Sequence, residues 1–270
     1  MKEQIKFAAF DVDGTILPFG KLSLSPRIVD TFKKLKQNNI KTIIATGREF
    51  VTIGKLLEQL EGNVDYFIGA NGSFIFDVKA NQIIHKNSIY YSDFEILYEN
   101  IIEYVDSISI MDDRFGHVSE NINTENWFLK PHKDKLKKID ENFTQLNRKN
   151  LFIITIHTKN KKTSNLVNKI IDKFHLNLCI QSSWESGMFI AAKGVTKSSA
   201  LRWLMIEMNS SLKNLIAFGD SENDTEMIRD AGIGVLMKGG SKQLLEYADY
   251  IAPSCDEDGV YLQLKKLKII

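Results

Sequence analysis

The chain has 270 residues, 43% of them hydrophobic, and its 35 Lys and Arg residues against 34 Asp and Glu residues leave a net charge of +1. This balance does not suggest a partner among nucleic acids or anionic membranes, and no apolar run approaches the roughly 20 residues that span a bilayer. The two cysteines, Cys179 and Cys255, do not make a disulfide framework, so we expect a reducing, cytoplasmic setting.

The first part of the chain predicts alternating strands and helices. Residues 5–10 are an apolar run typical of a buried strand. Residues 25–39 predict a helix that begins with Ser25 as N-cap and Pro26 in its first turn. Residues 40–47 predict the next strand. This order of strand, helix and strand is typical of a parallel sheet covered by helices.

The next segment continues the same pattern. Residues 48–62 predict a second helix that stops at Gly62, with an apolar face made of Phe50, Ile53, Leu57 and Leu60. Residues 65–72 predict a third strand that runs into a turn.

The pattern changes in the middle of the chain. Residues 73–86 predict a hairpin, and residues 92–105 predict a helix that opens with a capping box of Ser92 and Glu95. Weaker strand and helix patterns follow at 151–157, 164–174 and 176–183. No repeat or low-complexity linker accompanies the change.

The first pattern returns after about residue 188. It predicts a helix with Thr196 as N-cap, followed by strands and helices at 214–220, 222–231, 232–237 and 241–252. The elements together predict an α/β fold, a doubly wound parallel sheet with an α/β insert. We expect residues 1–81 and 189–270 to form the core and residues 82–188 to form the insert.

Four polar groups fall where predicted core strands or helices meet the carboxyl edge of the sheet, where ligands of such folds bind. They are Asp11 with Asp13, Thr46 with Gly47 and Arg48, Lys197, and the stretch 219–224. Each has a plain structural alternative, because Asp and Gly are common in turns, Thr and Asp cap helices, and most lysines are solvated. Their convergence on one sheet edge favours a functional site.

The carboxylates Asp11, Asp13, Asp220 and Asp224 would repel one another if they met at that edge, and this would raise their pKa values. A hard divalent cation relieves such repulsion, and ligands that are all oxygen suit Mg²⁺. Lys197 adds a positive charge, and Thr46 and Gly47 add hydrogen-bond donors. This combination predicts a cradle for a phosphoryl group.

Two carboxylates separated by one residue also predict a reaction. A carboxylate fixed at a strand end, here Asp11, can attack phosphorus and form an aspartyl phosphate. Asp13 can protonate the leaving alkoxide and then deprotonate the water that cleaves the intermediate.

These residues resemble the haloacid dehalogenase superfamily. Its four motifs are similar to "DVDGT" at 11–15, "IIATGR" at 43–48, "KGVTKSSAL" at 193–201 and "GDSENDTEM" at 219–227. "GANGS" at 69–73 and "EDGVYLQL" at 257–264 are similar to the Cof-like sugar-phosphatase branch. The resemblance covers both core segments, and an α/β cap between the second and third motifs is typical of the family.

The resemblance implies a role for each matching position. Asp11 would be nucleophile and metal ligand, and Asp13 would be acid and base and would bind Mg²⁺ through its carbonyl. Asp220 would be the other metal ligand, supported by Asp224. The phosphate would be held by Thr46, Gly47, Lys197 and Asn223.

The resemblance also implies a Mg²⁺-dependent phosphatase of small phosphate monoesters, such as sugar phosphates. The substrate would be chosen by the cap, where Arg114, His117, Trp127, Lys130 and His132 are candidates, although ordinary packing or a solvated surface explains each equally well. A phosphomutase would use the same residues. A receiver domain or an inactive binding protein is a non-enzymatic alternative, and the oligomeric state stays open.

Overall fold

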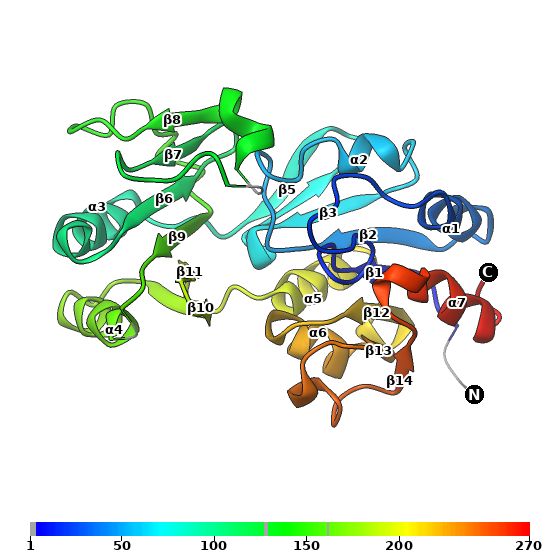
Figure 1. Ribbon diagram of the computed structural model, residues 1–270. Helices are drawn as coiled ribbons and strands as arrows, with labels where there is room; N and C mark the ends of the chain where they lie inside the picture. The colour runs from blue at the N-terminus through cyan, green and yellow to red at the C-terminus, as the bar shows by residue number, and fades with distance from the viewer. Residues whose placement is uncertain (1–3, 127–128, 161) are drawn as a thin grey trace. The chain divides into compact units, whose positions relative to one another are not determined.

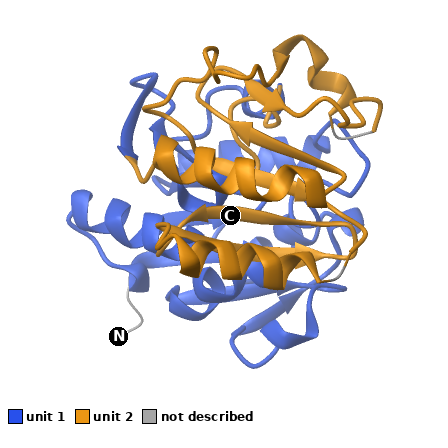
Figure 2. Cartoon of the chain, turned by 90° about the vertical axis from the view of Figure 1, so that its left-hand side faces the viewer, with its two compact units in different colours: residues 1–47, 55–85, 196–270 blue, residues 48–54, 86–195 orange. Residues whose placement is uncertain are grey.

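The computed structural model describes residues 4–126, 129–160 and 162–270 and divides the chain into two compact units (Figures 1 and 2). The first unit comprises Met1–Gly47, Lys55–His85 and Thr196–Ile270. The second comprises Arg48–Gly54 and Lys86–Val195. The chain therefore leaves the first unit twice and returns to it each time.

The described part of the first unit has an eight-stranded sheet in the order β14-β13-β12-β1-β2-β3-β4-β5 (Figure 1). Strands β14 to β3 in this order run parallel, and β4 runs antiparallel to β3. The strands are β1 (Phe7–Phe10), β2 (Lys41–Ala45), β3 (Tyr66–Gly69), β4 (Phe74–Asp77), β5 (Gln82–Lys86), β12 (Leu215–Gly219), β13 (Ile233–Met237) and β14 (Tyr250–Ala252).

Helices cover both faces of this sheet, which confirms the doubly wound α/β architecture. Ala9 of β1 belongs to an apolar cluster with Leu201 and Leu204 of α5, whereas the next residue, Phe10, packs its ring 4.9 Å from that of Phe32 in α1. The helices of this unit are α1 (Pro26–Gln37), α2 (Leu56–Gln59), α5 (Lys197–Glu207), α6 (Thr225–Asp230) and α7 (Gly259–Lys266). Single 3₁₀ turns are η1 (Ala70–Gly72), η4 (Leu212–Asn214), η5 (Glu222–Asp224), η6 (Lys242–Leu244) and η7 (Cys255–Glu257).

The described part of the second unit has a six-stranded sheet in the order β10-β11-β9-β6-β7-β8, antiparallel except between β7 and β8. Its strands are β6 (Ser107–Met111), β7 (Gly116–Val118), β8 (Leu136–Lys138), β9 (Ile153–His157), β10 (Leu178–Trp184) and β11 (Gly187–Ala192). Its helices are α3 (Tyr91–Ile101), α4 (Thr163–Lys173), η2 (Ile102–Tyr104) and η3 (Lys130–Lys135). Apolar residues of α3 and α4 share one core with this sheet, among them Phe94, Ile108, Ile154 and Val167.

Two predicted helix starts are confirmed. The Ser25 hydroxyl accepts a hydrogen bond from the Ile28 amide at 3.2 Å, and Pro26 is the first residue of α1. Thr196 caps α5 in the same way through the Ser199 amide. The second cap matters for the site, because it makes Lys197 the first residue of its helix.

The predicted helix over residues 48–62 is wrong, since only Leu56–Gln59 is helical. The Glu49 carboxylate accepts a hydrogen bond from the Thr52 hydroxyl at 2.6 Å, and Gly54 has a φ of +55°. Such local side-chain contacts compete with the backbone hydrogen bonds of a helix. Residues 50–55 consequently form turns, and Arg48–Gly54 joins the second unit.

The capping box predicted at Ser92 and Glu95 is also wrong. Helix α3 begins one residue earlier, at Tyr91, and Glu95 accepts a hydrogen bond from the Tyr91 hydroxyl instead. The helix expected within 222–231 divides into η5 and α6, and the one within 241–252 is reduced to η6. No helix in the described ranges is both long and apolar enough to cross a membrane.

Candidate active site

Asp11 lies directly beyond β1, and its amide still bonds to the Phe218 carbonyl of β12 at 3.0 Å. The chain then turns tightly, because the Val12 carbonyl accepts hydrogen bonds from the amides of residues 15–17. Gly14 in this turn has a φ of +84°, and a Cβ atom there would lie 2.5 Å from an oxygen of Asp220. Asp13 is half-buried in the same turn and forms an isolated β-bridge with Leu17.

Lys197 is buried between two carboxylates. Its Nζ lies 2.6 Å from Oδ1 of Asp11 and 2.7 Å from Oδ1 of Asp224. Burial disfavours the ammonium form, but the two carboxylates outweigh it and raise the pKa of Lys197. Lys197 is therefore a fixed positive charge that joins the end of β1 to the turn after β12.

The turn after β12 is organised by Asp224. Its Oδ2 accepts hydrogen bonds from the amides of Asp220 and Ser221, at 3.0 and 3.1 Å, so both of its oxygens have partners. Asp220 keeps its carboxylate toward the first turn, where Oδ1 accepts a hydrogen bond from the Thr15 hydroxyl at 3.3 Å. Asp224 thus holds the turn, while Asp220 presents its oxygens.

The donor set suits a hard cation. Carboxylate oxygens of Asp11, Asp220 and Asp224 all lie within 4.8 Å of one another. The pKa of Asp11 is raised to about 8, chiefly by burial. The positive charge of Lys197 lowers this pKa, and the charges of Asp224 and Asp220 raise it. Burial and then the charge of Asp224 raise the pKa of Asp220 to about 7. A divalent cation would relieve this repulsion, so the residues fit a metal with oxygen ligands.

Thr46 and Gly47 follow β2, and Asn223 lies in η5. Asn71 connects these two segments. Its backbone N–H donates a hydrogen bond to the Thr46 carbonyl at 2.9 Å, and its side-chain Oδ1 accepts one from Nδ2 of Asn223, also at 2.9 Å. Asn223 and the segment of Thr46 and Gly47 therefore both contact the same residue, Asn71.

Sequence reasoning missed two residues that contact the predicted set, Asn71 and Thr15. Both stand inside stretches quoted for the family resemblance, "GANGS" and "DVDGT". Their position in these stretches was the available signal.

The second unit gives a different picture for the predicted substrate contacts. His117 is completely buried and lies 2.8 Å from Asp112, which leaves it no surface for a substrate. His132 packs against Gly54, within the same unit. Arg114 and Lys130 have exposed side chains, and Trp127 lies outside the described residues.

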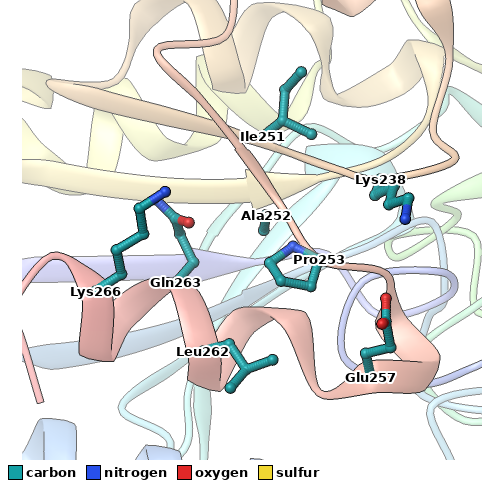
Figure 3. Close-up of a pocket in the computed structure, with 8 residues that line it drawn as sticks. All are labelled: Lys238, Ile251, Ala252, Pro253, Glu257, Leu262, Gln263 and Lys266. Atoms are coloured by element: carbon teal, nitrogen blue, oxygen red, sulfur yellow. The ribbon is translucent and has the colours of Figure 1, made fainter.

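A cavity of about 410 Å³ lies between β14 and α7 (Figure 3). Its walls include Ile251 and Pro253 on one side and Leu262 and Lys266 on the other, as the close-up shows. The residues described as lining it include none of the predicted site residues, so this cavity is separate from the carboxylate cluster.

Comparison with known proteins gives the chain a family context. The family model described as haloacid dehalogenase-like hydrolase matches residues 8–264. A 5-amino-6-(5-phospho-D-ribitylamino)uracil phosphatase of Bacillus subtilis is 29% identical over 263 residues, covering 95% of this chain and 93% of the relative. A pyridoxal phosphate phosphatase of Escherichia coli is 27% identical over 242 residues, covering 85% and 86%.

The fold is shared with solved structures. One, described as a sugar phosphatase of haloacid dehalogenase subclass IIB, superposes with a TM-score of 0.80 at 22% sequence identity. The superposition covers 98% of this chain and 100% of the other.

Proposed function

We propose, for a chain that belongs to the haloacid dehalogenase-like hydrolase family and is a hydrolase of phosphate monoesters, that it works through an aspartyl phosphate on Asp11 with Mg²⁺ as its cofactor. The observation that carries this proposal is the buried contact of Lys197 with Asp11 and Asp224 beside Asp220. A buried cation next to clustered carboxylates is costly to maintain as a purely structural device, and it is well suited to a phosphoryl group.

Asp11 would act as the nucleophile. Lys197 binds its Oδ1, which leaves Oδ2 to form a bond to phosphorus while the bond from phosphorus to the leaving oxygen breaks. Asp13 would give its proton to that oxygen as it leaves. Asp13 would then take a proton from water, whose oxygen attacks phosphorus and releases inorganic phosphate and the free Asp11 carboxylate.

Mg²⁺ would be held by Asp11, the Asp13 carbonyl and Asp220, and when bound it would offset the repulsion between the anionic nucleophile and the phosphate. Asp224 would support this set rather than bind directly, because Lys197 and two amides already occupy its oxygens. Thr46, Gly47, Lys197 and Asn223 would hold the phosphoryl oxygens.

The substrate would be a small phosphorylated metabolite. Two relatives bear the names of phosphatases for a ribitylamino-uracil phosphate and for pyridoxal phosphate, and the shared fold includes a sugar phosphatase. These leaving groups differ widely, whereas the phosphoryl group is common to all. We infer that the first unit handles the phosphoryl group and that the insert, predicted over 82–188 and comprising Lys86–Val195 in the structure, acts as a cap that selects the leaving group.

The first test is an assay of purified protein on a panel of phosphate monoesters. We expect release of inorganic phosphate that requires Mg²⁺ and is lost in excess chelator, with recovery when Mg²⁺ is restored. Equal release with chelator would rule out the metal assignment. A phosphoryl group that moves to a second position of the substrate, without phosphate release, would indicate a mutase instead.

The raised pKa values predict a pH-dependent effect of metal on stability. Asp11 and Asp220 titrate near 3.8 when unfolded but at about 8 and about 7 in the metal-free fold. Between the unfolded pKa of 3.8 and these raised values, the folded state binds more protons than the unfolded state. The stability of metal-free protein therefore falls as pH rises through this range. Mg²⁺ binds the deprotonated carboxylates, so it should stabilise the folded protein more at about pH 8.5 than at about pH 6.

Melting temperatures with Mg²⁺ and with chelator, measured at both pH values, check this prediction. The control is Asp220→Asn, which removes one of the two titrating groups and should flatten the pH dependence. An increase in melting temperature by Mg²⁺ that is the same at both pH values would contradict it.

A further inference from the structure

The turn after β3 has an unusual backbone. Ala70, Asn71 and Gly72 have φ values of +49°, +56° and +107°. Asparagine tolerates this region and glycine favours it, but alanine rarely adopts it, so the surroundings must hold the turn in place. Gly72 shows how closely it is held, because a Cβ atom there would lie 2.2 Å from the Thr196 carbonyl oxygen, at the N-cap of α5.

This turn directs the Asn71 side chain between the two loops of the proposed phosphate site. The residue is only 2% exposed. Its Oδ1 accepts the hydrogen bond from Asn223, and a Cβ atom on Gly47 would lie 3.2 Å from the same Oδ1. Asn71 therefore touches both the segment after β2 and the turn after β12.

The orientation of the Asn71 amide follows from its neighbours. In the structure the Ser221 hydroxyl donates to Oδ1 of Asn223 at 2.7 Å, and the other side-chain amide atom of Asn223, Nδ2, is a donor. That donor faces Asn71 and requires an acceptor, which makes the facing atom Oδ1. The remaining atom of the Asn71 amide is accordingly Nδ2, a donor.

Nδ2 of Asn71 is buried and has no hydrogen-bond partner among the described residues. A buried donor without a partner is unfavourable, and most such groups in folded proteins are satisfied. It stands 3.7 Å from the position of a Cβ atom on Gly47, and Gly47 is one of the proposed phosphate ligands. An anion bound at Gly47 would supply the missing acceptor.

We propose that Asn71 is a further ligand of the phosphoryl group, donating a hydrogen bond from Nδ2 to a phosphoryl oxygen while its Oδ1 orients Asn223. The proposal rests on the proposed function and adds a residue to its phosphate site. It also gives the strained turn a role, since the backbone of Ala70 and Asn71 directs this one amide.

The test measures binding of inorganic phosphate to the full-length protein in the presence of Mg²⁺, by calorimetry, together with KM for a phosphate ester. Asn71→Asp keeps the shape, the tolerance for positive φ and the Oδ1 acceptor, but it replaces the Nδ2 donor by an oxygen and adds a negative charge that would face the phosphate. We expect phosphate affinity to fall by about 10- to 100-fold, as for loss of a hydrogen bond to a charged group.

Asn71→Gly is the second variant, and wild-type phosphate affinity in it would overturn the proposal even if Asn71→Asp does not fold. Glycine favours positive φ, so we expect the melting temperature of the metal-free variant to be unchanged or raised while phosphate affinity falls about 10-fold. A purely structural role would lower both together. Asn39→Asp and Asn39→Gly are matched controls, because Asn39 has a φ of +57° but is exposed; they should bind phosphate as wild type does.

Two results would overturn the proposal. One is wild-type phosphate affinity in both folded Asn71 variants. Another is weakened binding in Asn71→Gly but not in Asn71→Asp, which would leave Asn71 only the orientation of Asn223. Failure of the wild-type protein to bind phosphate or to hydrolyse any ester would instead overturn the proposed function, and it would be seen before any variant is made.

Discussion

Asp11→Asn is expected to abolish turnover while the fold survives. The amide has nearly the shape of the carboxylate but cannot form the acyl phosphate, so kcat should fall by at least about 10⁴-fold. The fold should persist because Lys197 keeps its contact with Asp224. Without metal, the variant should be at least as stable as wild type, since the raised pKa of Asp11 shows that its charge is unfavourable there.

Phosphate release and thermal melting of the variant check both parts of this expectation. Asp65→Asn is a suitable control: Asp65 also accepts a hydrogen bond from a lysine, Lys41, at 3.3 Å, but it precedes β3 and so lies at the opposite edge of the parallel sheet. The control should retain wild-type activity. Turnover by Asp11→Asn within 100-fold of wild type would mean that another group attacks phosphorus.

The convergence of Asp11, Lys197 and Asp224 could be predicted because it depends on topology. Parallel strands bring their carboxyl ends to one edge, so residues that follow β1 and β12 meet there although 213 positions separate Asp11 from Asp224. The N-cap at Thr196 could also be predicted, because a cap depends on a local pattern of residue types. The family match also excludes the receiver-domain alternative, because it identifies a hydrolase.

The errors arose where a specific side-chain contact overrides a periodic pattern. Residues 48–54 have a helical pattern of apolar positions, but the Glu49 carboxylate bonds to Thr52 and Gly54 takes positive φ. Glu95 could have closed a capping box, yet Tyr91 lies one helical turn before it and uses its carboxylate. The contact of Asn71 with Asn223 was missed for another reason, since the topology brings both turns to one edge of the sheet but does not say which side chains meet there.

The turn that follows Asp11 makes the role of Asp13 separable from that of a metal ligand. Asp13 lies two residues beyond the nucleophile and is half-buried, so its carboxylate can serve a leaving group while its carbonyl serves a metal. If only the carbonyl matters, Asp13→Asn should keep nearly all activity, because the backbone is unchanged. If the carboxylate is the acid and base, the variant should lose about 10²- to 10⁴-fold.

We expect the loss to depend on the leaving group. A poor alkoxide, as in a sugar phosphate, needs the proton of Asp13 as the bond to phosphorus breaks, whereas an aryl oxide leaves without it. Asp13→Asn should therefore cost far more with a sugar phosphate than with an aryl phosphate. With the aryl ester the first step stays fast while hydrolysis of the aspartyl phosphate slows, because the water has lost its base.

The covalent intermediate should consequently accumulate on Asp11 in this variant. Mass spectrometry of reactions quenched during turnover of the aryl ester would find a phosphoryl adduct on the peptide that contains Asp11, in Asp13→Asn but at a much lower level in wild type. The double variant Asp11→Asn with Asp13→Asn serves as the control and should carry no adduct. Equal losses on both esters, with no adduct at any time, would show that Asp13 transfers no proton in either step.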